Sequence, residues 1–253
     1  MAGENTERLD KIVAASGAGT RRQVREWIRE GRVTVDGRVV TDPGQRGPVP
    51  GAGVALDGTP LVTGSVTLML NKPQGVITAT ADARHTTVVD LLPEGWRRRL
   101  VPAGRLDRDT EGLIILTDDG DLCHRIISPR HGVEKEYVVE VDGPLPPHLA
   151  AVFAEGVVLE DGYRTLPAHL VPVRIEAPGI ARVTVTEGKY HQIKRMFAAH
   201  GLRVRALRRI RIGSLSLDPD LPPGGYRLLN DREKAALLRN PGDLDAARGA
   251  EDR

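Results

Sequence analysis

A chain of 253 residues, with 40% hydrophobic residues, 28% charged residues and a formal net charge of +2, is typical of an ordinary globular protein of roughly one or two domains. Its only cysteine, Cys123, excludes an intramolecular disulfide framework and a multi-cysteine metal site. No stretch approaches the roughly 18 apolar residues of a membrane span and the polar N-terminus is not a secretory signal, so we expect a cytoplasmic protein.

Residues 7–62 predict a small module of two helices and a hairpin. The run RLDKIVAAS has apolar residues at helical spacing, and Thr20 is a suitable N-cap for a second helix, RRQVREWIRE. Asp36 and Gly37 lie between two β-branched runs, a pattern typical of a two-residue hairpin turn. A stretch rich in Gly and Pro at 42–53 and a short strand, VALDGTPL, complete the module.

The composition changes near Gly64, and residues 66–230 predict a larger domain that begins with a buried strand, VTLMLNK. Strands and helices do not alternate regularly there, which favours an α+β fold with a mixed, largely antiparallel sheet. We expect further strands at 111–117, 135–142, 170–175, 181–186 and 202–212, and helices at 87–92, 118–127, 146–155 and 189–200. Residues 231–253 predict a C-terminal helix, DREKAALLR, and then a flexible tail with too little hydrophobicity to pack.

Basic residues are concentrated on the first two predicted helices. Arg21, Arg25 and Arg29 share one helix face, where like charges repel each other and a phosphate backbone would neutralise them. Composition alone favours a solvated helix face instead. The succession R-L-D-K, T-R-R-Q-V and G-R-V-T-V-D-G nevertheless resembles the S4 RNA-binding domain. This resemblance implies RNA contacts for four residues: Lys11, Arg21, Arg22 and Arg25.

A charged turn precedes the predicted strand at 111–117. Its sequence is AGRLDRDTEGLIILTDDG, in which Gly104 and Gly112 would allow close approach of the backbone to another surface. No histidine lies at a ligand spacing from its three acids, so we expect no metal. Spacing alone favours a salt-bridged loop that leads into a strand.

This turn is similar to the active-site motif of the RluA/RsuA-type pseudouridine synthases. The resemblance implies that Asp107 is the catalytic carboxylate and that Arg105 lies near the RNA and helps to hold a flipped nucleotide. It leaves Asp109 and Glu111 as caps or turn formers.

Tyr137 follows Glu134-Lys135-Glu136 on a strand with alternating polarity. A tyrosine on a strand usually belongs to the core, with its hydroxyl hydrogen-bonded at an edge. Members of the same family carry an E-K-x-Y strand whose tyrosine stacks on the target base. The resemblance therefore implies that role for Tyr137.

The most basic segment spans residues 189–211. It contains eight basic residues and no acidic one: Lys189, Lys194, Arg195, Arg203, Arg205, Arg208, Arg209 and Arg211. So many like charges repel each other and indicate an anionic partner. The run Y-H-Q-I-K-R matches the third family motif, which implies that Lys194 pairs with Asp107 and keeps it ionised. We expect Gln192 and Arg195 to contact RNA, and we interpret His191 as structural.

The resemblance extends from about Glu7 to Leu229 and is nearest to the RsuA family. It implies an S4-like RNA-binding domain at 7–62 and a catalytic domain at 66–230. The implied function is the conversion of one uridine of small-subunit (16S) ribosomal RNA to pseudouridine. This conversion makes no bond to an outside group, so we expect no cofactor, and nothing in the sequence suggests an obligate dimer, so we expect a monomer. Two alternatives stay open, namely the same chemistry on large-subunit (23S) RNA and a non-catalytic S4-type factor for ribosome assembly.

Overall fold

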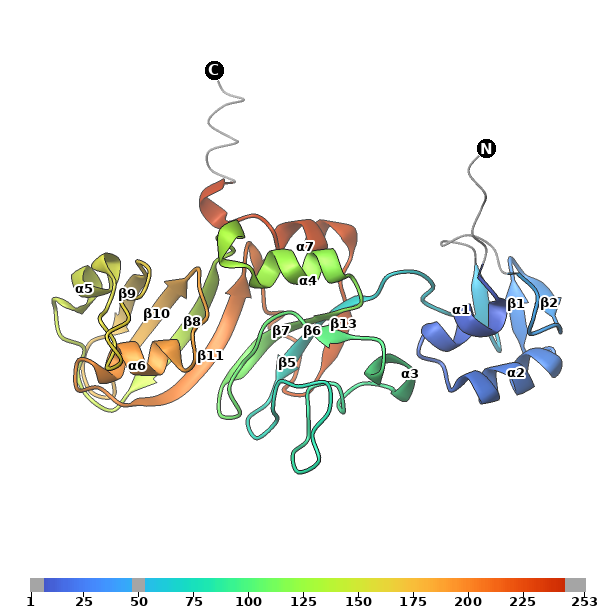
Figure 1. Cartoon of the computed structure of the whole chain (residues 1–253), viewed down its shortest axis with the longest axis horizontal. Helices are drawn as coiled ribbons and strands as arrows, with labels where there is room; N and C mark the ends of the chain where they lie inside the picture. Colours follow the sequence, from blue (N-terminus) through green and yellow to red (C-terminus); the bar gives the residue numbers. More distant parts are fainter. Residues whose placement is uncertain (1–6, 47–52, 244–253) are drawn as a thin grey trace, which may run out of the picture. The chain divides into compact units, whose positions relative to one another are not determined.

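The computed structural model describes residues 7–46 and 53–243 (Figure 1). They form two compact units. The first comprises the described residues of Met1–Val66 together with Ala79–Val101 and Thr117–Asp119, and the second comprises Thr67–Thr78, Pro102–Leu116 and the described residues from Gly120 onward. Residues 79–101 thus group with the N-terminal unit, whereas the sequence boundaries placed them in the catalytic domain. Among the described residues, no helix is both long and apolar enough to span a membrane.

The first unit contains the predicted module of helices and hairpin. Helices α1 (Leu9–Ala15) and α2 (Arg21–Arg29) lie with a four-stranded sheet of order β2-β1-β3-β4. The strands are β1 (Val33–Val35), β2 (Arg38–Val40), β3 (Val54–Leu56) and β4 (Thr59–Pro60). Thr20 caps α2 in a capping box with Gln23, as its residue type predicts. The single strand predicted over VALDGTPL is two strands, β3 and β4, which pair in antiparallel fashion.

The hairpin between β1 and β2 turns at Asp36 and Gly37, as predicted, with Val35 paired to Arg38. Both turn residues have positive φ angles, which a two-residue turn of this kind requires. A buried core of seven residues joins the helices to the sheet: Leu9, Val13, Val24, Ile28, Val33, Val40 and Val54.

The helix predicted over 87–92 is wrong, because these residues form consecutive turns. The side chain of Asp90 accepts hydrogen bonds from the backbone and the hydroxyl of Thr87, both at 2.8 Å, and this local bonding competes with a helix. Pro93 precedes a short helix, α3 (Glu94–Arg97), instead. Within the same unit, Arg99 donates to the carbonyls of Ala15 and Gly64, so residues 79–101 are tied to the N-terminal module.

A nine-stranded sheet organises the second unit, in the order β13-β5-β7-β11-β8-β10-β9, with β12 beside β11 and β6 beside β7. Strand β11 is parallel to β7 and antiparallel to β8, and the β8–β10, β9–β10 and β5–β13 pairs are also antiparallel. This mixed, largely antiparallel arrangement confirms the predicted α+β class. The strands are β5 (Thr67–Lys72), β6 (Val101–Pro102), β7 (Glu111–Thr117), β8 (Lys135–Val141), β9 (His169–Arg174), β10 (Ile180–Val185), β11 (Val204–Ile212), β12 (Leu215–Ser216) and β13 (Tyr226–Leu228).

Helices pack on this sheet in two groups. Helix α4 (Gly120–Ile127) and the segment that follows α7 (Asp231–Ala236) share one core with β5, β7 and β11 (Figure 1). Leu237, which belongs to the predicted helical segment DREKAALLR, is fully buried in that core; residues 244–253 of the predicted tail lie outside the described residues. Helices α5 (Leu149–Glu155) and α6 (Gln192–Ala198) meet through Phe153 and Phe197, whose ring centroids are 5.1 Å apart.

Candidate active site

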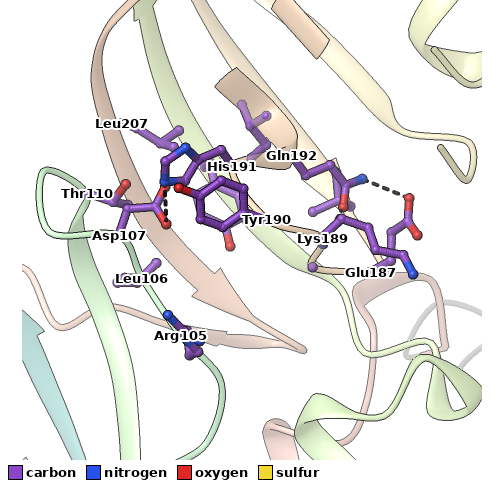
Figure 2. Close-up of a pocket in the computed structure, with 14 residues that line it drawn as sticks. Arg105, Leu106, Asp107, Thr110, Glu187, Lys189, Tyr190, His191, Gln192 and Leu207 are labelled. Atoms are coloured by element: carbon purple, nitrogen blue, oxygen red, sulfur yellow. Dashed lines mark hydrogen bonds and ion pairs between the residues drawn. The ribbon is translucent and has the colours of Figure 1, made fainter. Parts of the chain in front are cut away.

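A pocket of the second unit is formed by the loop before β7, by β8, β10 and β11, and by the turn that enters α6 (Figure 2). It therefore brings together three of the motifs singled out in the sequence. The residues that line it are Arg105, Leu106, Asp107, Thr110, Tyr137, Val185, Glu187, Gly188, Lys189, Tyr190, His191, Gln192, Ile193 and Leu207.

Lys72, at the end of β5, binds the loop that carries Asp107 through hydrogen bonds to backbone carbonyls. The Lys72 side chain is fully buried, and its Nζ donates to the carbonyls of Pro73 at 2.9 Å and Thr110 at 2.8 Å. Burial lowers the pKa of Lys72 to about 8, although the carboxylates of Asp109 and Asp107 oppose the shift. Nothing local in the sequence indicates that this lysine points inward.

Thr78 fastens the same loop from another side. Its hydroxyl donates to the carbonyl of Leu106 at 2.8 Å and accepts from the Leu106 backbone N–H at 3.0 Å. The backbone N–H of Gly75 donates to the carbonyl of Arg108 at 2.8 Å. These bonds on both sides of Asp107 hold its backbone in one conformation, and its carboxylate is left partly exposed in the pocket.

Lys194, on α6, faces the Asp107 loop as the resemblance implies. Its Nζ lies 3.2 Å from Asp107 Oδ2 and 2.5 Å from Asp109 Oδ1, so one ammonium forms ion pairs with two carboxylates. Burial alone would lower the pKa of Lys194, but the hydrogen bond to Asp109 and the charge of Asp107 outweigh it and raise this pKa. In the same way burial would raise the pKa of Asp109, and the bond to Lys194 lowers it instead.

His191 also reaches the carboxylate, with Nε2 3.6 Å from Asp107 Oδ1, as the dashed line in Figure 2 marks. The residue sits directly before α6 with φ 49° and ψ 30°, in the left-handed region. Its ring stacks against that of Tyr190. His191, for which the sequence predicts a structural role, therefore lies at the carboxylate as well.

Tyr137 lines the pocket from β8 and is only 9% exposed. Its hydroxyl accepts a hydrogen bond from Nη1 of Arg209 at 3.3 Å, and the guanidinium lies 5.9 Å from the ring centroid. Arg209 is itself 3% exposed, and its Nε donates to the carbonyl of Leu113 at 2.7 Å. One buried guanidinium therefore connects β7, the strand that follows the Asp107 loop, with the phenol on β8.

Close approach of β7 and β11 depends on Gly112. Its φ is +101°, and a Cβ atom there would lie 2.2 Å from the carbonyl oxygen of Arg209. The predicted role of Gly112 in close backbone approach is therefore confirmed. Gly104 differs, since the nearest atom to a Cβ there, a side-chain carbon of Ile127, is 3.7 Å away. Its φ of +92°, and not close packing, requires glycine at that position.

Gln192 stabilises the turn that enters α6. Its Nε2 donates to Glu187 at 2.9 Å, a bond drawn in Figure 2, and its Oε1 accepts from the backbone N–H of Lys189 at 2.9 Å. The side chain is 5% exposed, and both ends of its amide are occupied. These contacts favour a structural role for Gln192 over the predicted contact with RNA.

Many of the charges in 189–211 have partners that are distant in sequence. Arg195 pairs with Asp161 at 2.6 Å, and Arg211 pairs with Glu134 at 3.1 Å and Glu136 at 2.8 Å. The repulsion predicted for this segment is therefore relieved within the chain at Arg195 and Arg211, because their acidic partners lie far away in sequence. Arg105 is different: it is exposed at the pocket and makes no hydrogen bond or ion pair among residues 7–46 and 53–243.

A buried carboxylate organises the arginines of the first unit. Asp10 is fully buried and lies 3.1 Å from Arg21, 2.8 Å from Arg25 and 3.2 Å from Arg8. Burial would raise the pKa of Asp10, but the hydrogen bonds from the three guanidiniums hold this pKa far below its usual range. The predicted repulsion between Arg21 and Arg25 is thus relieved within the chain.

The other two predicted RNA contacts of this unit make exposed ion pairs. Lys11 pairs with Glu7 at 2.5 Å and Arg22 pairs with Glu26 at 3.7 Å. The Arg22 side chain is 92% exposed, and exposed pairs of this kind contribute little to stability. Both cations are therefore accessible to a partner.

Comparison with known proteins agrees with this geometry. The RNA pseudouridylate synthase family matches residues 66–199, and the S4 domain family matches residues 7–46. The chain is 45% identical over 233 residues to a ribosomal small subunit pseudouridine synthase A of Salmonella typhimurium, which covers 91% of this chain and 99% of that protein. It is also 42% identical over 237 residues to an uncharacterized RNA pseudouridine synthase of Bacillus subtilis, over 92% of this chain and 99% of that protein.

A crystal structure of a pseudouridylate synthase superposes with a TM-score of 0.64 and 37% identity, over 91% of this chain and 99% of that one. The match extends through both the S4 module and the unit that carries Asp107. With the family motif, the fold and the relatives in agreement, this chain belongs to the RNA pseudouridine synthases of the RsuA type.

Proposed function

We propose that the protein converts one uridine of small-subunit ribosomal RNA to pseudouridine. The observation that carries the chemistry is the pocket in which Asp107, held by Lys194, lies with Tyr137. The choice of RNA is supported by relatives named for the small ribosomal subunit, which match at 45% identity over 91% of this chain.

The reaction detaches the uracil from C1′ of the ribose, rotates it and rejoins it through C5. No atom is added from outside, so the reaction itself requires no cofactor. Asp107 acts at the sugar or at the base carbon, and it must be ionised to do so. The ammonium of Lys194, 3.2 Å from Oδ2, holds this carboxylate in position by charge attraction.

A uridine stacked in RNA cannot reach this carboxylate, so the nucleotide must leave the stack, at a cost of a few kcal/mol. Tyr137 would hold the extruded base by stacking, and its ring is fixed in the pocket by Arg209. Arg105, exposed at the pocket and without a partner in the described chain, would contact the phosphate of the flipped nucleotide.

The S4 module would supply part of the binding energy. Three guanidiniums surround the one carboxylate of Asp10, so this cluster keeps a net positive charge, and the three side chains are 43–49% exposed. Lys11 and the highly exposed Arg22 add further cations. Such a surface suits the phosphate backbone of RNA, which binds through the neutralisation of its charges.

We propose that this activity takes place in the cytoplasm of a bacterial cell. The bacterial relatives are named for the small ribosomal subunit, and ribosomal RNA is made and assembled in that compartment. We also propose that the protein acts as a monomer, since Asp107, Lys194 and Tyr137 come together within one unit of the chain and need no second copy to complete the site. Size-exclusion chromatography with light scattering tests the second point, and a stable dimer would contradict it.

The target is tested by mapping pseudouridines in cells with and without the protein, with carbodiimide-blocked primer extension. We expect one site to disappear from small-subunit RNA. Loss of a site from large-subunit RNA alone would instead favour the same chemistry on that RNA.

A non-catalytic S4-type assembly factor is the alternative from another class. Release of tritium from RNA labelled at C5 of uridine separates the two, because label is lost on isomerisation and kept on binding. An RNA-binding factor has no use for a carboxylate held by an ammonium inside a pocket, which is why we favour the enzyme.

A further inference from the structure

A stacked pair of aromatic rings lies at the pocket, beside the carboxylate of Asp107. The rings of Tyr190 and His191 have centroids 3.8 Å apart and an interplanar angle of 19° (Figure 2). Both residues line the pocket, and neither was given a role in binding by the sequence. Tyr190 is 74% exposed, the largest exposure among the large hydrophobic residues of the described chain.

The local backbone fixes this pair in place. His191 adopts a left-handed conformation, with φ 49°, which is uncommon for a residue with a side chain and costs conformational energy. The turn is held on either side, because Gln192 N–H donates to the Lys189 carbonyl at 3.1 Å and Arg195 N–H donates to the His191 carbonyl at 2.9 Å. The two rings are therefore presented by a rigid turn.

His191 covers one face of the Tyr190 ring, and the high exposure of that ring leaves its other face to solvent. Tyr137 presents a very different surface, since it is 9% exposed and set within the pocket. A deep ring suits the extruded base, whereas an open ring beside the same carboxylate suits a base that stays outside. Every nucleobase has a flat face that stacks on an aromatic side chain.

We propose that Tyr190, backed by His191, is a stacking platform for an unpaired base of the substrate RNA adjacent to the target uridine. The platform occupies the place in the stack that the target base leaves when it turns into the pocket. It thereby makes binding of the flipped state more favourable and selects RNA whose neighbouring base is free to stack. This inference deepens the proposed function and rests on it.

The experiment measures single-turnover formation of pseudouridine on an RNA fragment that contains the mapped uridine, over a range of enzyme concentrations. For Tyr190→Leu, which removes the ring, we expect the half-saturating concentration to rise roughly 5- to 150-fold, the range that corresponds to the loss of one base–aromatic stack. The rate at saturation should stay within about threefold of the wild type, because the stack on Tyr190 involves a base outside the pocket. Tyr190→Phe keeps the ring and should behave as the wild type.

An abasic substitution in the RNA identifies the partner of the ring. With the base removed at one position that flanks the uridine, wild type and Tyr190→Leu should bind equally, because neither then makes the stack. A penalty for Tyr190→Leu that is the same on every abasic RNA would overturn the proposal. So would a fall in the saturated rate alone, which would assign Tyr190 to the chemistry or to the placement of His191.

Failure of the proposed function gives a different result from failure of this inference. If the wild type forms pseudouridine in no ribosomal RNA, the function is wrong. If the wild type is active and Tyr190→Leu matches it on intact RNA, only the platform is wrong. Thermal melting of Tyr190→Leu should be unchanged, because the ring is exposed and removing it leaves no cavity.

Discussion

The ammonium of Lys194 lies between two carboxylates and is nearer to Asp109, at 2.5 Å, than to Asp107, at 3.2 Å. The two acids differ in exposure, with side chains 29% exposed for Asp107 and 70% exposed for Asp109. Only Asp107 lines the pocket with Tyr137. Asp109 therefore holds the ammonium from the solvent side, while Asp107 presents its carboxylate to the substrate.

This arrangement predicts unequal effects for substitutions of Lys194 and of Asp109. Lys194→Met should lower kcat by roughly 100-fold, because the carboxylate that we propose to be catalytic loses the ammonium that holds it in place. Lys194→Arg should retain more activity than Lys194→Met, since it keeps the charge. Asp109→Asn, the matched control, should stay within about threefold of wild type in single-turnover assays. Equal losses for Asp109→Asn and Lys194→Met would contradict this division of roles.

The ion pair between Lys194 and Asp109 predicts that neither group changes its charge in the neutral pH range, so neither should make kcat depend on pH there. The pKa of Lys194 is raised from 10.5, so the charge of the ammonium is lost only as pH rises above that value. The pKa of Asp109 is lowered from 3.8, so the charge of that carboxylate is lost only as pH falls below that value. If kcat does change with pH between about pH 5 and pH 9, the same change should therefore be seen in the Asp109→Asn variant.

Lys72 should support catalysis without contact with the RNA, because it fastens the loop that carries Asp107. Lys72→Met should lower kcat by roughly 10- to 100-fold, the cost of a displacement of a catalytic group by about 1 Å. Lys234→Met removes a lysine whose partner, Asp231, is 99% exposed, and should leave kcat unchanged.

Lys72 should also affect stability in a pH-dependent way. Its pKa falls from 10.5 to about 8 on folding, so between these pH values the unfolded chain binds more protons. The free energy of unfolding of wild type relative to Lys72→Met should thus rise between pH 8 and 10, by at most about 1.4 kcal/mol per pH unit. Urea unfolding at several pH values measures this difference. Parallel curves for the two proteins would show that Lys72 does not titrate there.

Arg209 should act through Tyr137, whose hydroxyl it holds at 3.3 Å. Arg209→Met should lower the single-turnover rate about tenfold, the usual cost of a hydrogen bond from a charged donor. Its exposed neighbour on the same strand provides the control, and Arg208→Met should leave this rate unchanged. In a Tyr137→Phe background the effect of Arg209→Met should shrink, because the bond is already absent. Full additivity of the two changes would contradict the link.

Much of the fold could be predicted because its signals are local. The strand expected at 111–117 is β7, with the same bounds, since four consecutive apolar residues follow a turn. Thr20 and the Asp36–Gly37 pair also act as their residue types predict. The helix expected at 87–92 fails because hydrogen bonds between the side chain of Asp90 and Thr87 stabilise turns there. That competition depends on side-chain geometry, which hydrophobic spacing does not report.

Some residues of the candidate site could also be predicted from local motifs, whereas others could not. The motifs identify Asp107, Tyr137 and Lys194, and the structure brings these three to one part of the second unit. The motifs do not predict Lys72 and Arg209 as parts of it, because Lys72 binds a carbonyl of the Asp107 loop and Arg209 binds a carbonyl on β7 and a phenol on β8. Contacts of this kind join residues that are tens of positions apart, so no local pattern marks them.

Asp10 provides a test of the arginine cluster in the S4 module. Asp10→Asn should lower the free energy of unfolding by about 1–3 kcal/mol, less than for a fully buried ion pair because the arginines are half exposed. The difference between the two proteins should shrink as pH falls below about 4, since a carboxylate with a lowered pKa contributes stability only while ionised. Glu26→Gln, which breaks an exposed pair with Arg22, should cost less than about 0.5 kcal/mol in urea unfolding.

The measurement that tests the central claim most directly is tritium release from small-subunit RNA labelled at C5 of uridine, with wild type and Asp107→Asn in parallel. We predict release by the wild type and none above background by the variant, while both bind the RNA with similar affinity in a filter assay. Release by Asp107→Asn at a rate near that of the wild type would show that another group performs the reaction, and the assignment of the Asp107 carboxylate would be wrong.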